Sequence, residues 1–96
     1  MLLEKPLTNG DTVSFKLASG EEVVARLDSL TASKYVVEKP LMLTMNKDGL
    51  ALAPFMFTIE ADAKITFDAN NVLCASRTEK EMAKQYLSST SNLVLV

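Results

Sequence analysis

The chain has 96 residues, of which 48% are hydrophobic and 23% are charged, and its formal net charge is −2. This length fits a single domain, and this composition is typical of a globular protein rather than a disordered one. The chain has no histidine, so it lacks the commonest general base and metal ligand, and its ten Lys and Arg residues form no basic run. We therefore expect a non-catalytic domain with no cofactor and no metal site.

Residues 1–12 are predicted to be an irregular lead-in, because Pro6 and the polar residues 8–11 are typical of turns. Apolar residues then alternate with polar ones through residues 13–17 and again through residues 23–27, which predicts two half-buried strands. Gly20 lies between them and is free to adopt positive φ in a tight turn. The two strands are therefore predicted to form an antiparallel hairpin.

A third strand is predicted at residues 35–37, and it either ends there or continues past Pro40 into residues 41–45. Proline cannot donate a hydrogen bond to a sheet, so Pro40 should lie at an edge, a bulge or a break between strands. The turn residues 46–49 then join residues 41–45 to another apolar run, so residues 41–56 are predicted to form a second hairpin. Because this hairpin is apolar on both faces, we expect it to be covered on both sides or to contact another subunit.

Two more strands are predicted at residues 64–68 and 72–75, with a tight turn between them. Thr78 and Glu81 have the spacing of a capping box, which predicts a helix over residues 78–90. Serine, threonine and asparagine at residues 88–92 are predicted to end this helix. The apolar tail 92–96 is β-prone and is predicted to pair with an exposed strand edge.

The segment VSFKLASGEEVVARLDSLTASKYVVEK, residues 13–39, resembles the first motif of the Sm/LSm/Hfq superfamily. In this resemblance Gly20 is the turn glycine, Ala25 is the small residue at which the second strand bends, and Leu27 and Leu30 are core positions. Residues 67–75, FDANNVLCA, resemble the second motif, but Asp68 stands where that motif has arginine. The resemblance covers residues 13–75 and implies a small, five-stranded, strongly bent antiparallel SH3-like barrel. The 41–56 hairpin extends it, and the helix 78–90 follows.

Other features resemble small Sm-like proteins of T4-like and cyanobacterial phages. These are Lys39 and Pro40 after the third strand, the Pro-Phe-Met step at residues 54–56, and Tyr86 in the C-terminal helix. The superfamily resemblance implies closed rings of about five to seven copies, in which neighbouring edge strands pair. The strands that would make these subunit contacts are the two predicted at residues 64–68 and 72–75. Their apolar residues are Ile65, Phe67, Val72 and Leu73.

The resemblance also raises the alternative of an RNA-binding ring of the Hfq or LSm kind. Lys34, Tyr35 and Asn70 are then the candidate RNA-binding residues, with Tyr35 able to stack on a base. Two residues argue against this alternative: a carboxylate at Asp68 repels phosphate, and Tyr35 is better suited to a core or subunit contact than to base stacking. The single cysteine, Cys74, suits a reducing cytoplasm, which would be that of the host if a phage encodes the protein, and no membrane partner is expected.

Overall fold

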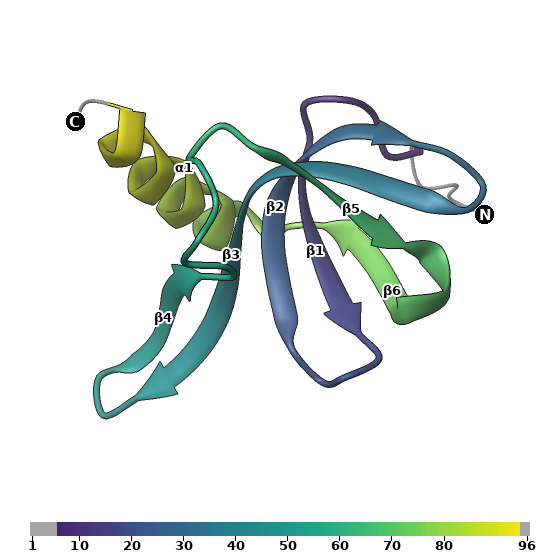
Figure 1. Ribbon diagram of the computed structural model, residues 1–96. Helices are drawn as coiled ribbons and strands as arrows, with labels where there is room; N and C mark the ends of the chain where they lie inside the picture. Colours follow the sequence, from purple (N-terminus) through teal and green to yellow (C-terminus); the bar gives the residue numbers. More distant parts are fainter. Residues whose placement is uncertain (1–5, 95–96) are drawn as a thin grey trace.

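The computed structural model describes the backbone of residues 6–94 and the side chains of residues 6–91. It consists of one bent, antiparallel, six-stranded sheet and a C-terminal helix (Figure 1), which confirms the predicted fold class. The elements in chain order are β1 (Thr12–Leu17), β2 (Glu22–Leu30), β3 (Lys34–Asn46), β4 (Gly49–Pro54), β5 (Lys64–Asp68), the 3-10 turn η1 (Ala69–Asn71), β6 (Val72–Arg77) and α1 (Lys80–Val94).

The sheet has the strand order β4-β3-β2-β1-β6, and β5 also pairs with β3. Strand β2 occupies one edge of β3, so β4 and β5 share the other edge. β5 lies beside the first half of β3, and β4 lies beside its second half. The third strand therefore continues past Pro40, and its second half forms the predicted hairpin with β4, which projects from the barrel (Figure 1).

A β-bulge bends β3 at Pro40. Val24 pairs with Leu41 and Arg26 pairs with Glu38, so Lys39 and Pro40 together stand opposite one residue of β2. Lys39 has φ +50, a left-handed conformation that non-glycine residues seldom adopt. A bulge tolerates a residue that cannot donate to the ladder and increases the local twist, so Pro40 helps to place the bend of the sheet.

The inward faces of the strands form the main core. Its buried residues are Val13, Phe15, Leu17, Val23, Ala25, Leu27, Val37 and Phe67. The core residues of β1 and β2 occupy alternate positions, as the apolar alternation at residues 13–17 and 23–27 predicted. The prediction that Leu30 is a core residue is wrong: its side chain is 42% exposed, because it ends β2 and is followed by the exposed loop 31–33.

Helix α1 covers a second, smaller core on the outer face of the sheet, where Tyr86 packs against Val24 and Leu41. The predicted capping box is wrong. The Glu79 carboxylate accepts hydrogen bonds from the backbone N–H groups of Glu81 (2.9 Å) and Met82 (3.0 Å), and these bonds lower the pKa of Glu79. The Thr78 hydroxyl instead hydrogen-bonds the Ser14 hydroxyl of β1 at 2.8 Å. Glu79 therefore caps the helix, and Thr78 fastens its start to the sheet.

The helix also continues further than predicted, through the polar run 88–92 to Val94. Thr90 is buried, and its hydroxyl donates to the carbonyls of Tyr86 (3.0 Å) and Leu87 (3.2 Å). The run is therefore helical despite its weak helix propensity, with the Thr90 hydroxyl bonded back to the preceding turn. The predicted β-prone tail is wrong for residues 92–94, which are helical, while residues 95–96 lie outside the described residues. Within the described chain, α1 is not long and apolar enough to cross a membrane.

Candidate functional site

Three strands of the sheet each have one open edge. Within residues 6–94, β4 and β5 pair only with β3, and β6 pairs only with β1. β4 belongs to the projecting hairpin, whereas β5 and β6 belong to the barrel. The backbone N–H and C=O groups on the other edge of each strand have no partner strand. Such an edge is a template for another strand, and an SH3-like sheet that does not close on itself presents two of them.

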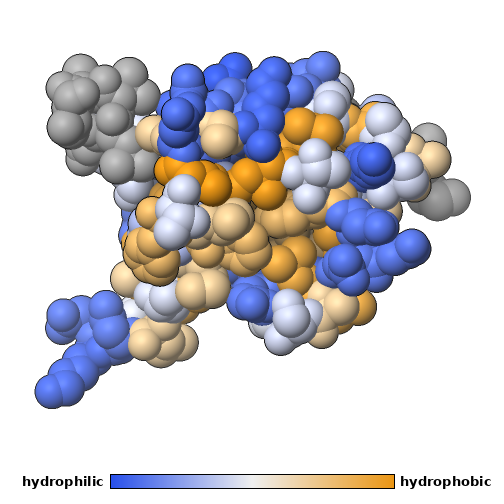
Figure 2. All heavy atoms as spheres, viewed as in Figure 1, coloured by the Kyte–Doolittle hydropathy of each residue, from blue (hydrophilic) through white to orange (hydrophobic). Residues whose placement is uncertain are grey.

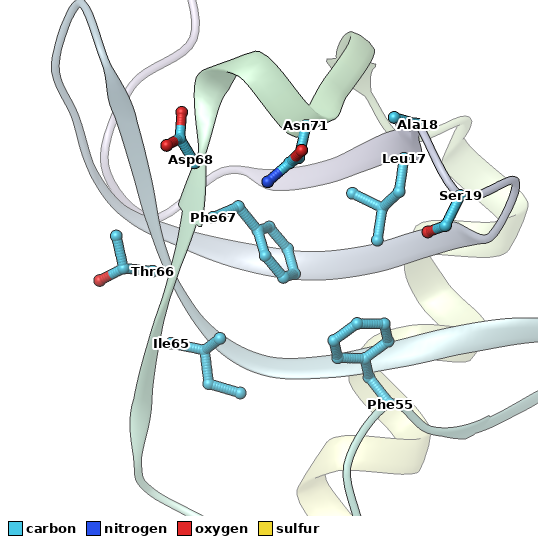
Figure 3. A pocket seen from close by; sticks show the side chains of 9 residues that line it. All are labelled: Leu17, Ala18, Ser19, Phe55, Ile65, Thr66, Phe67, Asp68 and Asn71. Atoms are coloured by element: carbon cyan, nitrogen blue, oxygen red, sulfur yellow. The ribbon is translucent and has the colours of Figure 1, made fainter.

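An open groove of about 580 Å³ lies where the barrel fails to close, and its apolar side chains lead into the main core (Figure 3). The lining residues come from the end of β1, the chain after β4, and the segment from β5 to η1. They are Leu17, Ala18, Ser19, Phe55, Ile65, Thr66, Phe67, Asp68 and Asn71. The groove therefore exposes the edge of a hydrophobic core beside the open edge of β5.

Aromatic contacts hold the floor of this groove. The Phe67 ring lies between Phe15 and Phe55, with centroid separations of 5.7 and 5.6 Å and interplanar angles of 73° and 85°. Edge-to-face geometry of this kind is favourable for aromatic rings. Phe67 and Ile65 therefore pack on their own core. β5 offers a neighbour its open backbone edge and the exposed side chains of Lys64, Thr66 and Asp68.

The β1–β2 turn forms one wall of the groove. Gly20 has φ +107, and its N–H donates to the Leu17 carbonyl at 2.9 Å. The Ala18 N–H donates to the Asn71 carbonyl at 2.7 Å, which ties this turn to η1. The glycine turn of the first motif and the asparagine turn of the second motif therefore meet at the groove.

A β-bulge in β6 leaves one apolar side chain exposed on this strand. Lys16 pairs with Cys74 and Leu17 pairs with Val72, so Leu73 is the extra residue between them. Its side chain is 67% exposed, while Val72 packs against the main core. Leu73 is thus an apolar side chain on an open strand, and of the four predicted contact residues it is the most exposed.

The predicted RNA-binding residues lie at one end of the barrel. The Ala69 N–H donates to the Ser33 carbonyl at 2.8 Å, which brings η1 against the loop 31–33. Lys34 and Asn70 are both exposed there. Asp68 stands opposite Lys34 in the register of β3 and β5, and its carboxylate accepts a hydrogen bond from the Asn70 N–H at 2.9 Å. Asp68 thus caps η1 in the place where the family motif has arginine.

Tyr35 does not join this exposed group. Its half-buried ring packs on the main core and lies edge-to-face against Phe15, with a centroid separation of 5.1 Å and an interplanar angle of 75°. Because Tyr35 pairs with Phe67 across β3 and β5, both side chains point inward. The structure therefore agrees with a core role for Tyr35, which was one of the two alternatives open from the sequence.

The sequence did not single out Phe55 or the ion pair at Arg77. Phe55 lines the groove, and the sequence marked it only as part of the Pro-Phe-Met step at residues 54–56, not as a groove residue. The Arg77 guanidinium lies 3.3 Å from the Asp11 carboxylate and donates to the Pro6 carbonyl at 2.6 Å, which fastens the lead-in to the end of β6. These contacts join residues far apart in the chain, so no local pattern predicts them.

The bent antiparallel barrel is similar to the fold of solved Sm proteins. No protein-family model matches the sequence, and no curated protein matches it either. Two solved structures share the fold. A heptameric archaeal Sm protein has 17% sequence identity and a TM-score of 0.51, over 74% of this chain and 90% of that one. The P. aerophilum SmAP1 heptamer has 16% identity and a TM-score of 0.52, over 75% of this chain and 84% of that one.

Proposed function

We propose that this protein assembles with copies of itself into a closed ring and acts as a non-catalytic structural or interaction module. The observation that carries the proposal is the presence of two unpaired strand edges in the barrel, one on β5 beside the open groove and one on β6. Pairing β5 of one copy with β6 of the next would satisfy both edges and cover the exposed part of the core.

Ring closure also suits the size of the chain. A domain of this length buries only about 60–68% of the surface of its unfolded chain, so an added interface contributes strongly to its stability. The same interface repeated head-to-tail closes into a ring when the rotation between copies permits it. Both structural neighbours are heptamers, which supports a ring of about five to seven copies here.

RNA binding is the weaker alternative. Lys34 and Asn70 are exposed together, but the ring of Tyr35 is engaged with Phe15, and the Asp68 carboxylate occupies the centre of this end. A carboxylate at that position opposes phosphate binding. Origin from a phage and residence in the cytoplasm stay predictions from the sequence.

Leu73→Lys tests the assembly. Leu73 is 67% exposed, so the variant should fold, but a charge on the open side of β6 would oppose pairing with β5 of a neighbour. We expect the concentration for half-dissociation to rise by about tenfold to a hundredfold, the range for an apolar side chain that is no longer buried at an interface. Analytical ultracentrifugation over a dilution series measures this change.

Leu30→Lys is the matched control. Leu30 is 42% exposed at the end of β2, a strand that pairs with β1 on one edge and β3 on the other, and the same substitution there should leave the assembly unchanged. A wild-type protein that remains monomeric at high micromolar concentration would refute the proposed ring. Equal effects of the two substitutions would show that the assembly uses another surface.

A further inference from the structure

Strand β4 has an open edge that the proposed ring does not use. β4 pairs only with β3, and no other strand within residues 6–94 pairs with its outer edge. In the proposed ring, the six residues of a neighbour's β6 would lie along the five residues of β5. The chain after β6 then turns into α1, and the Thr78 N–H donates to the Thr12 carbonyl of its own copy at 3.0 Å. The edge of β4 therefore stays unpaired in such a ring.

The pairing of β4 with β3 determines which of its backbone groups face outward. The Phe55 N–H donates to the Pro40 carbonyl at 3.1 Å, directly after the last register pair of the two strands. In an antiparallel pair, hydrogen-bonded positions alternate with positions whose N–H and C=O point away from the partner strand. Every second residue counted back from Phe55 is therefore bonded to β3. Leu50, Leu52 and Pro54 lie between these residues and direct their backbone groups to the open edge.

The sequence of β4, GLALAP, has little that protects an open edge. It has no charged or polar side chain, and its one proline, Pro54, stands at its last position. Leu50 is 51% exposed, and its cross-strand partner Met45 is 75% exposed. The hydrophilic part of the projecting hairpin is confined to its tip, at the lower left in Figure 2. An uncharged, apolar edge of this kind is a template for a further strand.

Leu50 and Met45 belong to an apolar row that α1 covers only in part. Leu43 and Leu52 of the same hairpin pack against the second core, to which α1 contributes. These two residues are partners in the register, as are Met45 and Leu50 nearer to the turn. Because side chains two residues apart on a strand share a face, all four lie on one face of the hairpin. The row is thus half-buried near the barrel and exposed near the turn.

The edge of β4 is complementary to itself. Around a two-fold axis at Leu52, two β4 strands would run antiparallel, with the N–H of each Leu52 donating to the carbonyl of the other. The Leu50 N–H of each copy would then donate to the Pro54 carbonyl of its partner. Residues that pair in this way have side chains on the same face, so the apolar rows of the two copies would adjoin. Neither strand has a charge that opposes this approach.

We propose that β4 pairs with β4 of a second copy across a two-fold axis, as a contact separate from the β5–β6 contact of the ring. The occupant is a second copy of this chain, because the uncharged edge and the apolar row match themselves under two-fold symmetry. The contact joins two copies, or two rings where rings are formed. It does not depend on the ring, since it uses a different strand.

Leu50→Pro tests the pairing of the backbone. The substitution removes the outward N–H of residue 50, and proline is tolerated at an edge position whose N–H faces solvent. Leu50→Val keeps this N–H and is the matched control. Both substitutions are made in the Leu73→Lys protein, in which the ring contact is weakened, so that pairing of β4 is observed as a dimer.

We expect Leu50→Pro to raise the half-dissociation concentration of this dimer about tenfold to a hundredfold, because two-fold symmetry removes the hydrogen bond from both copies. Leu50→Val should change it by less than about threefold. Analytical ultracentrifugation over a dilution series measures both changes, and circular dichroism verifies that each variant is folded.

Hydrogen exchange of the backbone amides tests the same contact in the wild type. The amides of Leu50 and Leu52 face the open edge in a single copy, so a rise in protein concentration should slow their exchange about tenfold. The amide of Lys47, in the exposed turn of the hairpin, is the control and should exchange at a constant rate.

The outcomes separate this contact from the ring. A Leu73→Lys protein that is monomeric at high micromolar concentration, or equal dissociation of the Leu50→Pro and Leu50→Val proteins, would refute the β4 contact and leave the ring standing. Wild-type dimers that Leu50→Pro dissociates, with no larger species, would support the β4 contact and refute the ring. If Leu50→Pro does not fold, the wild-type amides decide: fast exchange of Leu50 and Leu52 at every concentration would refute self-pairing and leave this edge to a strand of another protein.

Discussion

At the residue scale, Tyr86 shows how one hydroxyl secures the C-terminal helix. The bulge in β3 turns the carbonyls of Glu38 and Lys39 towards α1, and the buried Tyr86 hydroxyl donates to both, at 3.2 and 2.8 Å. Burial raises the pKa of Tyr86 from its ordinary value of 10.0 to about 12. The left-handed backbone conformation of Lys39 is therefore stabilised partly by Tyr86, a residue far from it in the sequence.

Tyr86→Phe should lower the free energy of unfolding by about 1–2 kcal/mol, because it leaves a buried carbonyl without its donor. Urea denaturation with a circular dichroism signal measures the loss. Leu87→Ala on the exposed side of the same helix is the control and should change stability by less than about 0.5 kcal/mol. Equal losses in the two variants would contradict the role of the hydroxyl.

The same residue predicts a pH dependence. The pKa of Tyr86 is higher in the folded protein than in the unfolded chain, so its contribution to the free energy of unfolding is fully present below pH 10. That contribution is lost as the pH rises from 10 towards 12, because the tyrosine of the unfolded chain loses its proton first. The wild type should therefore lose stability over that interval more steeply than Tyr86→Phe. Parallel curves for the two proteins in urea denaturation at stepped pH would contradict this expectation.

At the scale of elements, β4 and β5 are two parts of one long edge of the barrel, separated by the loop 55–63. The sequence predicted both strands, but it did not show that they lie on the same edge of β3. That relation depends on β2 occupying the opposite edge. Only the pairing of distant residues makes the loop recognisable as an insertion.

Deletion of residues 57–62 tests whether the loop has any role in the fold. The remaining three loop residues are enough to pass residues 39 and 40 of β3, and Phe55 keeps its place in the groove. We expect the free energy of unfolding to change by less than about 1 kcal/mol, because loop closure depends weakly on length. Thermal unfolding by circular dichroism measures it, and a loss of cooperative unfolding would show that the loop supports the barrel.

At the scale of the whole molecule, the barrel is an incomplete structure with an open side. The main core reaches the surface at the groove, and β5 beside the groove and β6 each have an edge without a partner strand within residues 6–94. Aggregation through such edges is a hazard that closed association removes. The proposed ring would use β5 and β6 at every contact, so the number of contacts would equal the number of copies.

Cross-linking distinguishes a closed ring from an open chain of copies. Cys74 is exposed on β6 and is the only cysteine, and Thr66→Cys would add an exposed cysteine on β5. A short bismaleimide should then give a ladder that ends at about five to seven copies. The wild type, with Cys74 alone, is the control and should stop at dimers. A ladder without an upper limit would indicate filaments, and no ladder beyond dimers in the variant would contradict pairing of β5 with β6.

The sequence by itself determined the local features of this protein. Alternation of apolar residues located the strands, glycine located the first turn, and the two motifs indicated an Sm-like barrel, because these signals lie within a few neighbouring residues. The tertiary structure alone decided that Tyr35 packs in the core, that Tyr86 joins α1 to the bulge in β3, and that β4 and β5 share one edge. Each of these depends on contacts between residues far apart in the chain, whose energies outweigh the local preferences.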